Sequence, residues 1–255
     1  MNYIAAAMTD KGSFRKVNQD SLCIKIADTD NHGQVVMALI CDGMGGFSKG
    51  ELASATLVQS FSNWYENIFP EIINDCDMQT LSKRWQKMIA HQNDIIMRYG
   101  TTLDIKLGTT ISALLIIDNK YMIMHVGDSR IYKVSDTIEQ LTVDHTLVAR
   151  EVLQGKITAD EAKHDKRKHV LLQCVGASKI IEPHVVCGEV DSGDIFFMCS
   201  DGLYNTFDDE EILNIIVAND NKSVGELRSL CSLMIESAKS NGERDNISAA
   251  IIKCM

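Results

Sequence analysis

The sequence contains little proline and no long hydrophobic run. Two prolines occur among 255 residues, and the longest apolar runs cover about seven residues. A helix that crosses a bilayer needs roughly 20 apolar residues. The N-terminal stretch also lacks a basic region followed by an apolar segment and a cleavage site, so it does not read as a secretory signal. We therefore expect a cytoplasmic protein without a membrane partner.

Positive charge is scarce as well. The chain has 25 Lys and Arg residues against 35 Asp and Glu residues, a formal net charge of −10. Proteins that bind nucleic acid normally present a basic face to the phosphate backbone. We therefore do not expect nucleic acid as a partner. The surplus of carboxylates is compatible with a cation site, although most carboxylates on any protein are solvated surface groups.

Closely spaced soft metal ligands are absent. None of the eight cysteines lies within four residues of another, and the seven histidines include no His-x-x-x-His pair. Zinc sites usually depend on such pairs. Several cysteines, such as Cys41 and Cys199, stand inside apolar runs, where a reduced thiol packs as a small hydrophobic group. Oxygen ligands remain, and these suit Mg²⁺ or Mn²⁺.

The chain twice repeats an apolar, strand-like run that ends on an aspartate and a glycine. Residues 35–41 lead into Asp42-Gly43, and residues 195–200 lead into Asp201-Gly202. Asp128 follows a third apolar run and Asp245 precedes a fourth. A buried strand that stops on a carboxylate holds that carboxylate at the edge of a core. Four such groups, far apart in sequence, predict one shared site for a hard cation.

The pattern of apolar residues predicts about ten strands and four long helices. The expected strands are 2–8, 20–27, 34–41, 109–117, 120–127, 130–134, 138–142, 184–190, 194–200 and 246–253. The expected helices are 51–69, 78–99, 208–219 and 223–240. Asp118-Asn119 is expected to turn a hairpin, and Gly43, Gly45, Gly46 and Gly50 to form a glycine-rich loop. The strands come in antiparallel-style groups, which favours an α+β sandwich with helices covering the sheets.

Six short motifs in this order and spacing resemble the PPM family of metal-dependent Ser/Thr protein phosphatases, also called type 2C. The motifs are Thr9–Asp20, Asp42–Gly46, Gly108–Thr110, Val126–Arg130, Ser200–Leu203 and Arg244–Ser248. Each motif alone is weak, but six in order, over nearly the whole chain, are specific. The set is most similar to the compact bacterial members of the family.

The resemblance implies a four-layer α-β-β-α fold in a single domain over residues 1–255, with two antiparallel sheets flanked by helix pairs. Residues 145–181 would form a flap beside the active site. Two Mn²⁺ or Mg²⁺ ions, and a third, weaker ion, would bind at one edge of the sandwich. The implied ligands are the carboxylates of the motifs and one backbone carbonyl: Asp20, Asp42, Gly43, Asp128, Asp201 and Asp245.

Within that set, the resemblance implies that Asp42 bridges two ions, whereas Asp128 and Asp201 hold the third. Arg15 would bind the substrate phosphate. The implied reaction is hydrolysis of phosphoserine and phosphothreonine in proteins by a water activated between two ions, without a covalent intermediate. A planar guanidinium suits this role because it can bind two phosphate oxygens at once.

Simpler interpretations stay open for individual residues. An Asp-Gly pair is a common tight turn. Arg130 and Arg244 are expected to be structural, and His145 to serve packing or capping rather than catalysis. The basic run 163–169 is either a solvated face or an attractant for acidic phosphoproteins. Met44 stands where some eukaryotic relatives carry a histidine proposed as general acid, so the proton donor is not assigned. Gln19 stands where some relatives carry glutamate, so Asp20 alone would supply the carboxylate there.

Three functions therefore compete. The first is an active phosphoprotein phosphatase that opposes a Ser/Thr kinase and works as a monomer. The second is a pseudophosphatase that only binds partners; its signature would be a lost metal aspartate, and every expected aspartate is present. The third is a metal-dependent hydrolase of small phosphate esters.

Overall fold

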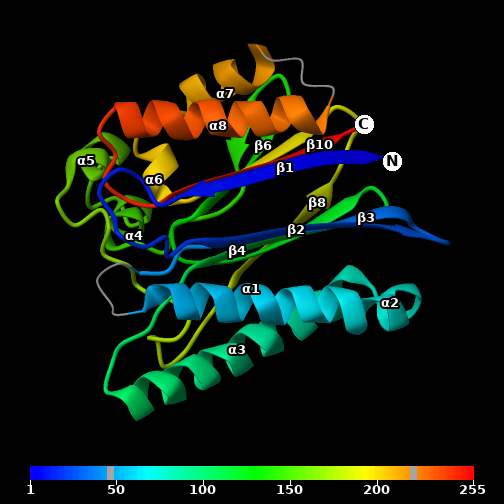
Figure 1. The fold of residues 1–255 in the computed structure, drawn as a ribbon, viewed down its shortest axis with the longest axis horizontal. Helices are drawn as coiled ribbons and strands as arrows, with labels where there is room; N and C mark the ends of the chain where they lie inside the picture. Colours follow the sequence, from blue (N-terminus) through cyan, green and yellow to red (C-terminus); the bar gives the residue numbers. More distant parts are fainter. Residues whose placement is uncertain (45–48, 219–222) are drawn as a thin grey trace.

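The computed structural model describes residues 1–44, 49–218 and 223–255. Two five-stranded antiparallel sheets pack face to face, with helices on both outer faces (Figure 1). The strands are β1 (Tyr3–Asp10), β2 (Ser21–Thr29), β3 (Gly33–Cys41), β4 (Ile111–Ile117), β5 (Lys120–Val126), β6 (Arg130–Val134), β7 (Ile138–Gln140), β8 (His184–Glu189), β9 (Ile195–Cys199) and β10 (Ile247–Cys254). The helices are α1 (Gly50–Asn67), α2 (Phe69–Ile72), α3 (Met78–Leu103), α4 (Leu147–Leu153), α5 (Ala159–His164), α6 (Asp201–Tyr204), α7 (Asp209–Ala218) and α8 (Val224–Ser240), with a 3₁₀ turn at Ile73–Asp75.

One sheet has the order β1-β10-β9-β6-β7 and the other the order β2-β3-β4-β5-β8. Their facing sides form the inner core, which includes Val36, Ile40, Leu114, Phe196 and Ile252. Strands β3, β4 and β5 are buried on both faces, which explains their continuous apolar sequences. The α+β sandwich expected from the sequence is confirmed.

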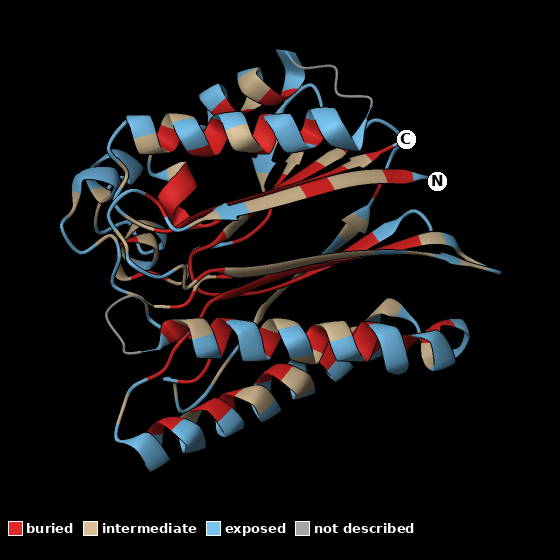
Figure 2. Cartoon of the chain, in the orientation of Figure 1, coloured by how far each residue is buried: buried red, intermediate tan, exposed pale blue. Residues whose placement is uncertain are grey.

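Helices α1 and α3 cover the sheet that contains β3, and α7 and α8 cover the sheet that contains β10 (Figure 1). Their buried residues lie on the side that faces the sheet (Figure 2). Under α1 and α3, the rings of Phe61, Trp64 and Trp85 meet edge to face at centroid distances of 5.0 and 5.6 Å. Burying each large apolar side chain contributes about 1.5–3 kcal/mol, so these contacts hold α1 and α3 together.

Each expected strand is present, with ends within two residues of the expected bounds. Asp118 turns the β4–β5 hairpin in the left-handed conformation (φ 56°). The helix expected over residues 78–99 is longer than expected and ends at Leu103. The Thr101 and Thr102 hydroxyls bond back to helix carbonyls, and Asp104 ends the helix with φ 53°. Helices α2 and α6 and the 3₁₀ turn were not expected.

The expectation of a glycine-rich loop falls partly outside the described residues, since Gly45 and Gly46 lie there. The same holds for residue 219 at the end of the fourth expected helix. Residues 145–181 contain α4 and α5 and lie at one end of the sandwich, opposite the two chain termini (Figure 1). Within the described ranges, none of the helices combines the length and apolar character that crossing a membrane requires.

Candidate metal centre

Strand register brings four of the expected aspartates to one edge of the sandwich. Strands β2 and β3 pair antiparallel with Ser21 opposite Cys41, so Asp20 and Asp42 emerge side by side. In the other sheet, β9 ends at Cys199, which pairs with Ala249 near the start of β10. Asp201 and Asp245 therefore leave their strands at the same edge. The two sheets contribute one such pair each.

A cleft of about 700 Å³ opens at this edge. Of the expected site residues, Arg15, Asp42, Asp128, Asp201 and Asp245 line it. The cleft is also lined by Met44, Thr110, Lys168, His169, Leu171, Asn205, Gly242, Glu243 and Arg244. Residues at the edges of both sheets and from the segment 145–181 thus share one cavity.

Asp20 lies behind the cleft and is only 6% exposed. Its Oδ2 accepts hydrogen bonds from the Ser248 hydroxyl at 2.6 Å and from the Ser200 hydroxyl at 3.0 Å. Ser200 follows β9 and directly precedes Asp201, and Ser248 is the second residue of β10, which Asp245 precedes. This carboxylate therefore links the strand ends of both sheets.

The turn at Asp42-Gly43 is held on both sides. The Gly43 N–H donates to the Gln19 carbonyl at 3.1 Å, and the Met44 N–H donates to the Gly108 carbonyl at 3.0 Å. A Cβ at Gly43 would lie 2.5 Å from the Gln19 and Gly50 carbonyl oxygens. Only glycine fits this close approach of three backbone segments, so Gly43 is required by packing whatever else its carbonyl does.

The carboxylates raise one another's pKa values. Burial, followed by the charges of Asp20 and Asp201, raises the pKa of Asp42 well above its ordinary value. Burial and the charge of Asp201 do the same for Asp128. Burial raises the pKa of Asp20 to about 7, against the opposing hydrogen bonds from Ser248 and Ser200. Each shift records a charge that the protein alone does not neutralise.

Among the residues that the structure describes, two buried carboxylate oxygens have no hydrogen-bond partner, the Oδ1 atoms of Asp20 and Asp201. An unpaired buried carboxylate oxygen is costly, and a divalent cation would satisfy it. Within the described part of the chain, no group of three or more His, Cys, Asp or Glu side chains is placed so that it could hold a metal ion by itself. Mg²⁺ and Mn²⁺ fit such an open donor set, because they retain water ligands and accept backbone carbonyls. The residues therefore fit hard divalent cations.

Arg15 reaches the cleft from the loop after β1. Its Nη2 donates to Asp245 Oδ2 at 2.7 Å. Partial burial alone would lower the pKa of Arg15, but the hydrogen bond and charge of Asp245 raise it. The neighbouring Arg244 guanidinium lies 5.2 Å from the centre of the Phe14 ring and also lines the cleft. Asp245 thus orients one guanidinium at the cleft wall.

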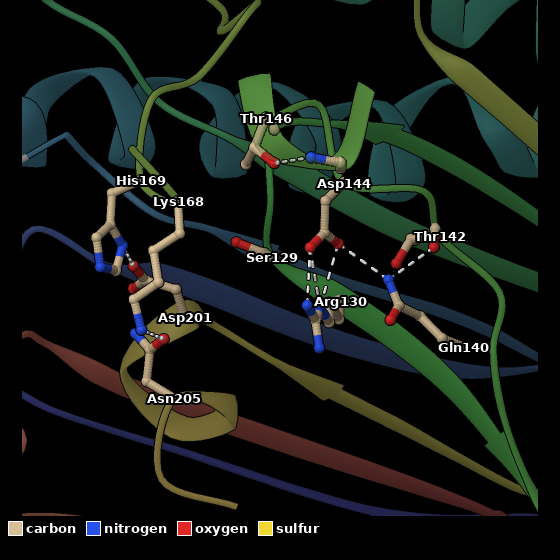
Figure 3. Close-up of polar contacts among 12 residues, drawn as sticks. Ser129, Arg130, Gln140, Thr142, Asp144, Thr146, Lys168, His169, Asp201 and Asn205 are labelled. Carbon is tan, nitrogen blue, oxygen red and sulfur yellow. Dashed lines mark hydrogen bonds and ion pairs between the residues drawn. The ribbon is translucent and has the colours of Figure 1, made fainter. Parts of the chain in front are cut away.

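Sequence reasoning did not single out two cleft contacts from the basic run 163–169 (Figure 3). His169 Nδ1 lies 3.4 Å from Asp201 Oδ2, and Lys168 Nζ donates to Asn205 Oδ1 at 3.2 Å. Periodicity could not reveal these contacts, because residues 165–171 have no regular spacing and meet α6 only through the tertiary fold. This part of the basic run lies at the cleft rather than on a purely solvated face.

Arg130 and His145 have the structural contacts expected of them. Arg130 binds Asp144 through Nε and Nη2, the shortest contact being 2.8 Å (Figure 3). The Arg130 guanidinium also stacks on the Tyr204 ring at 3.8 Å. His145 packs against His125 with ring centres 5.0 Å apart. Burial and the neighbouring His184 lower the pKa of His145 to about 4. The capping role belongs to Thr146, which accepts from the Ala149 N–H at the start of α4.

Comparison with known families gives one match over most of the chain. A family model described as Protein phosphatase 2C matches residues 13–233. A Streptococcus pyogenes protein named putative protein phosphatase 2C-type is 31% identical over 252 residues, which cover 96% of this chain and 94% of that protein. The serine/threonine phosphatase stp of Listeria monocytogenes is 31% identical over 250 residues, with 96% and 93% coverage.

Solved structures of similar fold agree with these sequence matches. The structure of the S. agalactiae serine/threonine phosphatase superposes with a TM-score of 0.86 at 29% identity and covers 100% of both chains. The catalytic domain of the phosphatase PstP, solved in complex with two manganese ions, superposes with a TM-score of 0.76 at 27% identity, covering 98% of this chain and 97% of that one.

Proposed function

Because this chain belongs to the protein phosphatase 2C family, we propose that it is a metal-dependent hydrolase that removes phosphate from phosphoserine and phosphothreonine in proteins. One observation carries the proposal: a single cleft joins Arg15, a phosphate-binding type of side chain, with Asp42, Asp128, Asp201 and Asp245. Charge of both signs in one cavity suits a phosphate ester bound beside divalent cations.

The ligands we propose are the oxygen donors at the strand ends. The carboxylates of Asp20, Asp42, Asp201 and Asp245 and the carbonyl of Gly43 would hold two ions, Mn²⁺ or Mg²⁺. Asp128 would hold a third, weaker ion together with Asp201. When bound, such ions supply a water of lowered pKa and positive charge beside the phosphate oxygens. The unpaired Oδ1 atoms of Asp20 and Asp201 support this assignment.

Arg15 would bind the phosphate. Its Nη2 is engaged by Asp245 at 2.7 Å, which restricts the long side chain to one direction along the cleft wall. A planar guanidinium held in this way can donate to two phosphate oxygens with little loss of side-chain entropy on binding. The charge of Arg15 also opposes the negative charge that the phosphoryl group spreads over its oxygens.

The leaving serine or threonine oxygen needs a proton, and Met44 cannot provide one. Among the described residues that line the cleft, His169 is the one histidine. Its Nδ1 faces Asp201 Oδ2 at 3.4 Å, so the carboxylate orients the ring toward the cleft. We assign His169 as the donor to the leaving oxygen, a role that the sequence alone left unassigned.

Residues 145–181 would act as the flap of one phosphatase domain that includes the whole chain. Lys168 and Leu171 from this segment line the cleft, so its loops meet the substrate beside the phosphate. The partners would be phosphoproteins made by a Ser/Thr kinase. A monomer in the cytoplasm is consistent with eight cysteines, all within the described residues, that form no disulfide.

The test is hydrolysis of p-nitrophenyl phosphate and of a phosphothreonine peptide by the full chain with Mn²⁺. We expect turnover that is lost with a chelator and in Asp42→Ala. Absence of turnover with either Mn²⁺ or Mg²⁺, or turnover that survives Asp42→Ala, would refute the proposal.

Two further measurements separate the competing functions. Calorimetric titration with Mn²⁺ distinguishes the enzyme from a pseudophosphatase, since a pure binding module has no need of the ion. Comparison of kcat/KM on phosphopeptides and on free phosphorylated metabolites distinguishes it from a hydrolase of small esters. We expect the phosphopeptides to be the better substrates.

A further inference from the structure

Gly127, the residue before Asp128, is held by two histidines that do not line the cleft. The His145 N–H donates to the Gly127 carbonyl at 2.7 Å, and the Gly127 N–H donates to His145 Nδ1 at 3.2 Å. His125, fully buried on β5, places Nε2 2.9 Å from the same carbonyl and donates to it. Both polar groups of one backbone unit are therefore fixed, immediately before a cleft carboxylate.

His145 is bound from its other side by the flap. The Gln173 amide Nε2 donates to His145 Nδ1 at 3.0 Å, and the Leu172 N–H donates to the His145 carbonyl at 2.8 Å. Thr146 and Leu171 form the adjacent β-bridge. The strand-like segment that follows Lys168 and His169 is thus aligned on His145. One residue joins the Asp128 turn to the flap residues in the cleft.

Gly127 cannot shift without disturbing a second part of the site. It has a φ of +116°, and a Cβ at this position would lie 2.4 Å from Thr110 Cγ2. The Thr110 hydroxyl in turn accepts from the Asp42 N–H at 2.9 Å. A displacement of Gly127 is therefore transmitted to Asp128 along the chain and to Asp42 through Thr110.

The hydrogen bonds also define which ring nitrogen of His145 carries the proton. Gln173 is itself oriented by Glu182, whose N–H donates to Oε1 and whose carbonyl accepts from Nε2, each at 3.0 Å. The amide therefore presents an N–H to His145. The Gly127 N–H is the second donor. Nδ1 faces two donors, so it is the unprotonated acceptor, and the ring is the neutral Nε2–H form.

We propose that His145 is a positioning residue for the phosphatase reaction: as an acceptor at Nδ1 and a donor at its backbone N–H, it sets Asp128 and the flap segment 171–173, of which Leu171 lines the cleft, in one fixed relation. This inference rests on the proposed function. His145 touches neither the substrate nor the reacting atoms. Its effect is on the cation held by Asp128 and on turnover, acting through Gly127.

Two variants of similar size separate the acceptor from the bulk of the ring. His145→Asn places Oδ1 where Nδ1 stands, so both donors keep a partner. His145→Leu places a methyl group there. We expect two effects of His145→Leu. The lower-affinity step of Mn²⁺ binding in calorimetry becomes weaker, and kcat on p-nitrophenyl phosphate falls. Each change should be about 10- to 100-fold, as is usual when the support of a metal ligand is lost. KM changes little, since Arg15 is untouched, and His145→Asn recovers most of both losses.

Tyr65→Phe is the matched control. It also removes one buried hydrogen bond, from the Tyr65 hydroxyl to the Val35 carbonyl at 2.8 Å, at the end of β3 remote from the cleft. It should lower Tm while leaving Mn²⁺ binding and kcat unchanged. A loss of activity in His145→Leu that Tyr65→Phe reproduces at equal Tm would show a merely structural effect and overturn the proposal.

A third readout needs no variant at position 145. Nitrogen-15 NMR of the histidine rings in the metal-free wild type should show His145 unprotonated at Nδ1. A proton on Nδ1, an unchanged Mn²⁺ isotherm in His145→Leu, or His145→Asn as impaired as His145→Leu would each refute the inference. If His145→Leu does not fold, Gln173→Leu is the substitute, because it removes one of the two donors to Nδ1. It should show the same losses to a smaller degree, and wild-type behaviour of Gln173→Leu would refute the inference.

A wild type without phosphatase activity refutes the proposed function. The Mn²⁺ isotherm and the ring tautomer still decide the inference on His145 in that case.

Discussion

Thr110 and Asp42 bind each other twice. The Asp42 N–H donates to Thr110 Oγ1 at 2.9 Å, and the Thr110 N–H donates to the Asp42 carbonyl at 2.8 Å. Thr110 is 1% exposed, and its hydroxyl also meets the Ser129 hydroxyl at 2.9 Å. The aspartate that ends β3 therefore depends for its position on a threonine that precedes β4. The candidate metal ligand Asp42 is therefore held by strand ends rather than by a free loop.

Replacement of Thr110 tests this clamp. Thr110→Val keeps the shape of the side chain but removes the acceptor, which leaves the Asp42 N–H unpaired at a cost of about 1–3 kcal/mol. We expect weaker Mn²⁺ binding in calorimetry, by about tenfold or more, and a lower kcat. Thr110→Ser keeps the hydroxyl and is the control. Equal Mn²⁺ affinity in the two variants would contradict the clamp.

The Asp20 carboxyl should add to the stability of the metal-free protein as the pH falls, whereas the buried His125 and His145, whose pKa values are lowered, act in the opposite direction. In the folded state the pKa of Asp20 is raised to about 7 by burial, whereas an Asp in an unfolded chain titrates near 4. The folded form therefore binds more protons than the unfolded form between these values, so its free energy of unfolding rises as pH falls from about 7 to about 4. The pKa values of Asp42 and Asp128 are raised as well and act in the same direction.

Denaturant unfolding with EDTA at pH 5 and pH 8 measures this effect. Asp20→Asn should reduce the difference, and Asp160→Asn, whose side chain is 92% exposed, should leave it unchanged. Saturating Mn²⁺ should reverse the trend, because the cation replaces the proton as the partner of the carboxylates. A difference between pH 5 and pH 8 that Asp20→Asn leaves unchanged would disprove the assignment.

Neutralising Asp42 should stabilise the metal-free protein and abolish its response to metal. The Asp42 carboxylate is repelled by Asp20 and Asp201 in a poorly solvated place, so Asp42→Asn removes a repulsion while keeping the shape. We expect a higher Tm in EDTA and no increase with Mn²⁺. The wild type should gain about 2.7 kcal/mol at 100 times Kd. A variant that gains as much from Mn²⁺ as the wild type would exclude Asp42 as a ligand.

Arg15→Lys should impair substrate binding more than turnover. Lysine keeps the charge but loses the planar fork and the geometry of the Asp245 contact. Hydrogen bonds to a charged group contribute about 1.5–3 kcal/mol, which predicts a fall in kcat/KM of roughly 10- to 100-fold on a phosphothreonine peptide, mostly as a raised KM. Arg84→Lys on α3, outside the cleft, is the control. A normal KM in Arg15→Lys would argue against phosphate binding by Arg15.

His169→Asn should affect substrates according to their leaving group. Nitrophenolate leaves without a proton, but the threonine oxygen requires one. We therefore expect a loss of roughly 10²- to 10⁴-fold in kcat on the phosphothreonine peptide, the usual contribution of general acid catalysis, and a small loss on p-nitrophenyl phosphate. His164→Asn, in the same basic run on α5, should behave as the wild type. Equal losses on both substrates would mean that His169 acts through Asp201 rather than on the leaving group.

The sequence by itself predicted the strands, the α+β class and the aspartates that end at one edge. These features follow from local sequence. An apolar run such as residues 35–41 is buried in any packed fold, and the carboxylate that ends it must reach either solvent or a cation. The family motifs added expected roles for Asp42, Asp201 and Arg15. The structure brings these side chains into one cleft, and their roles as ligands remain predictions for the experiments above.

Only the tertiary structure decided how these residues are supported. The register of β2 on β3 sets Asp20 beside Asp42, the β3–β4 ladder brings Thr110 to the Asp42 backbone, and the packing of the flap brings His169 to Asp201 and Gln173 to His145. None of these contacts produces a periodic pattern in the sequence, because each joins segments whose proximity depends on strand order and loop packing. The sequence gives the chemical type of each side chain, but which group that side chain contacts is determined by the whole fold.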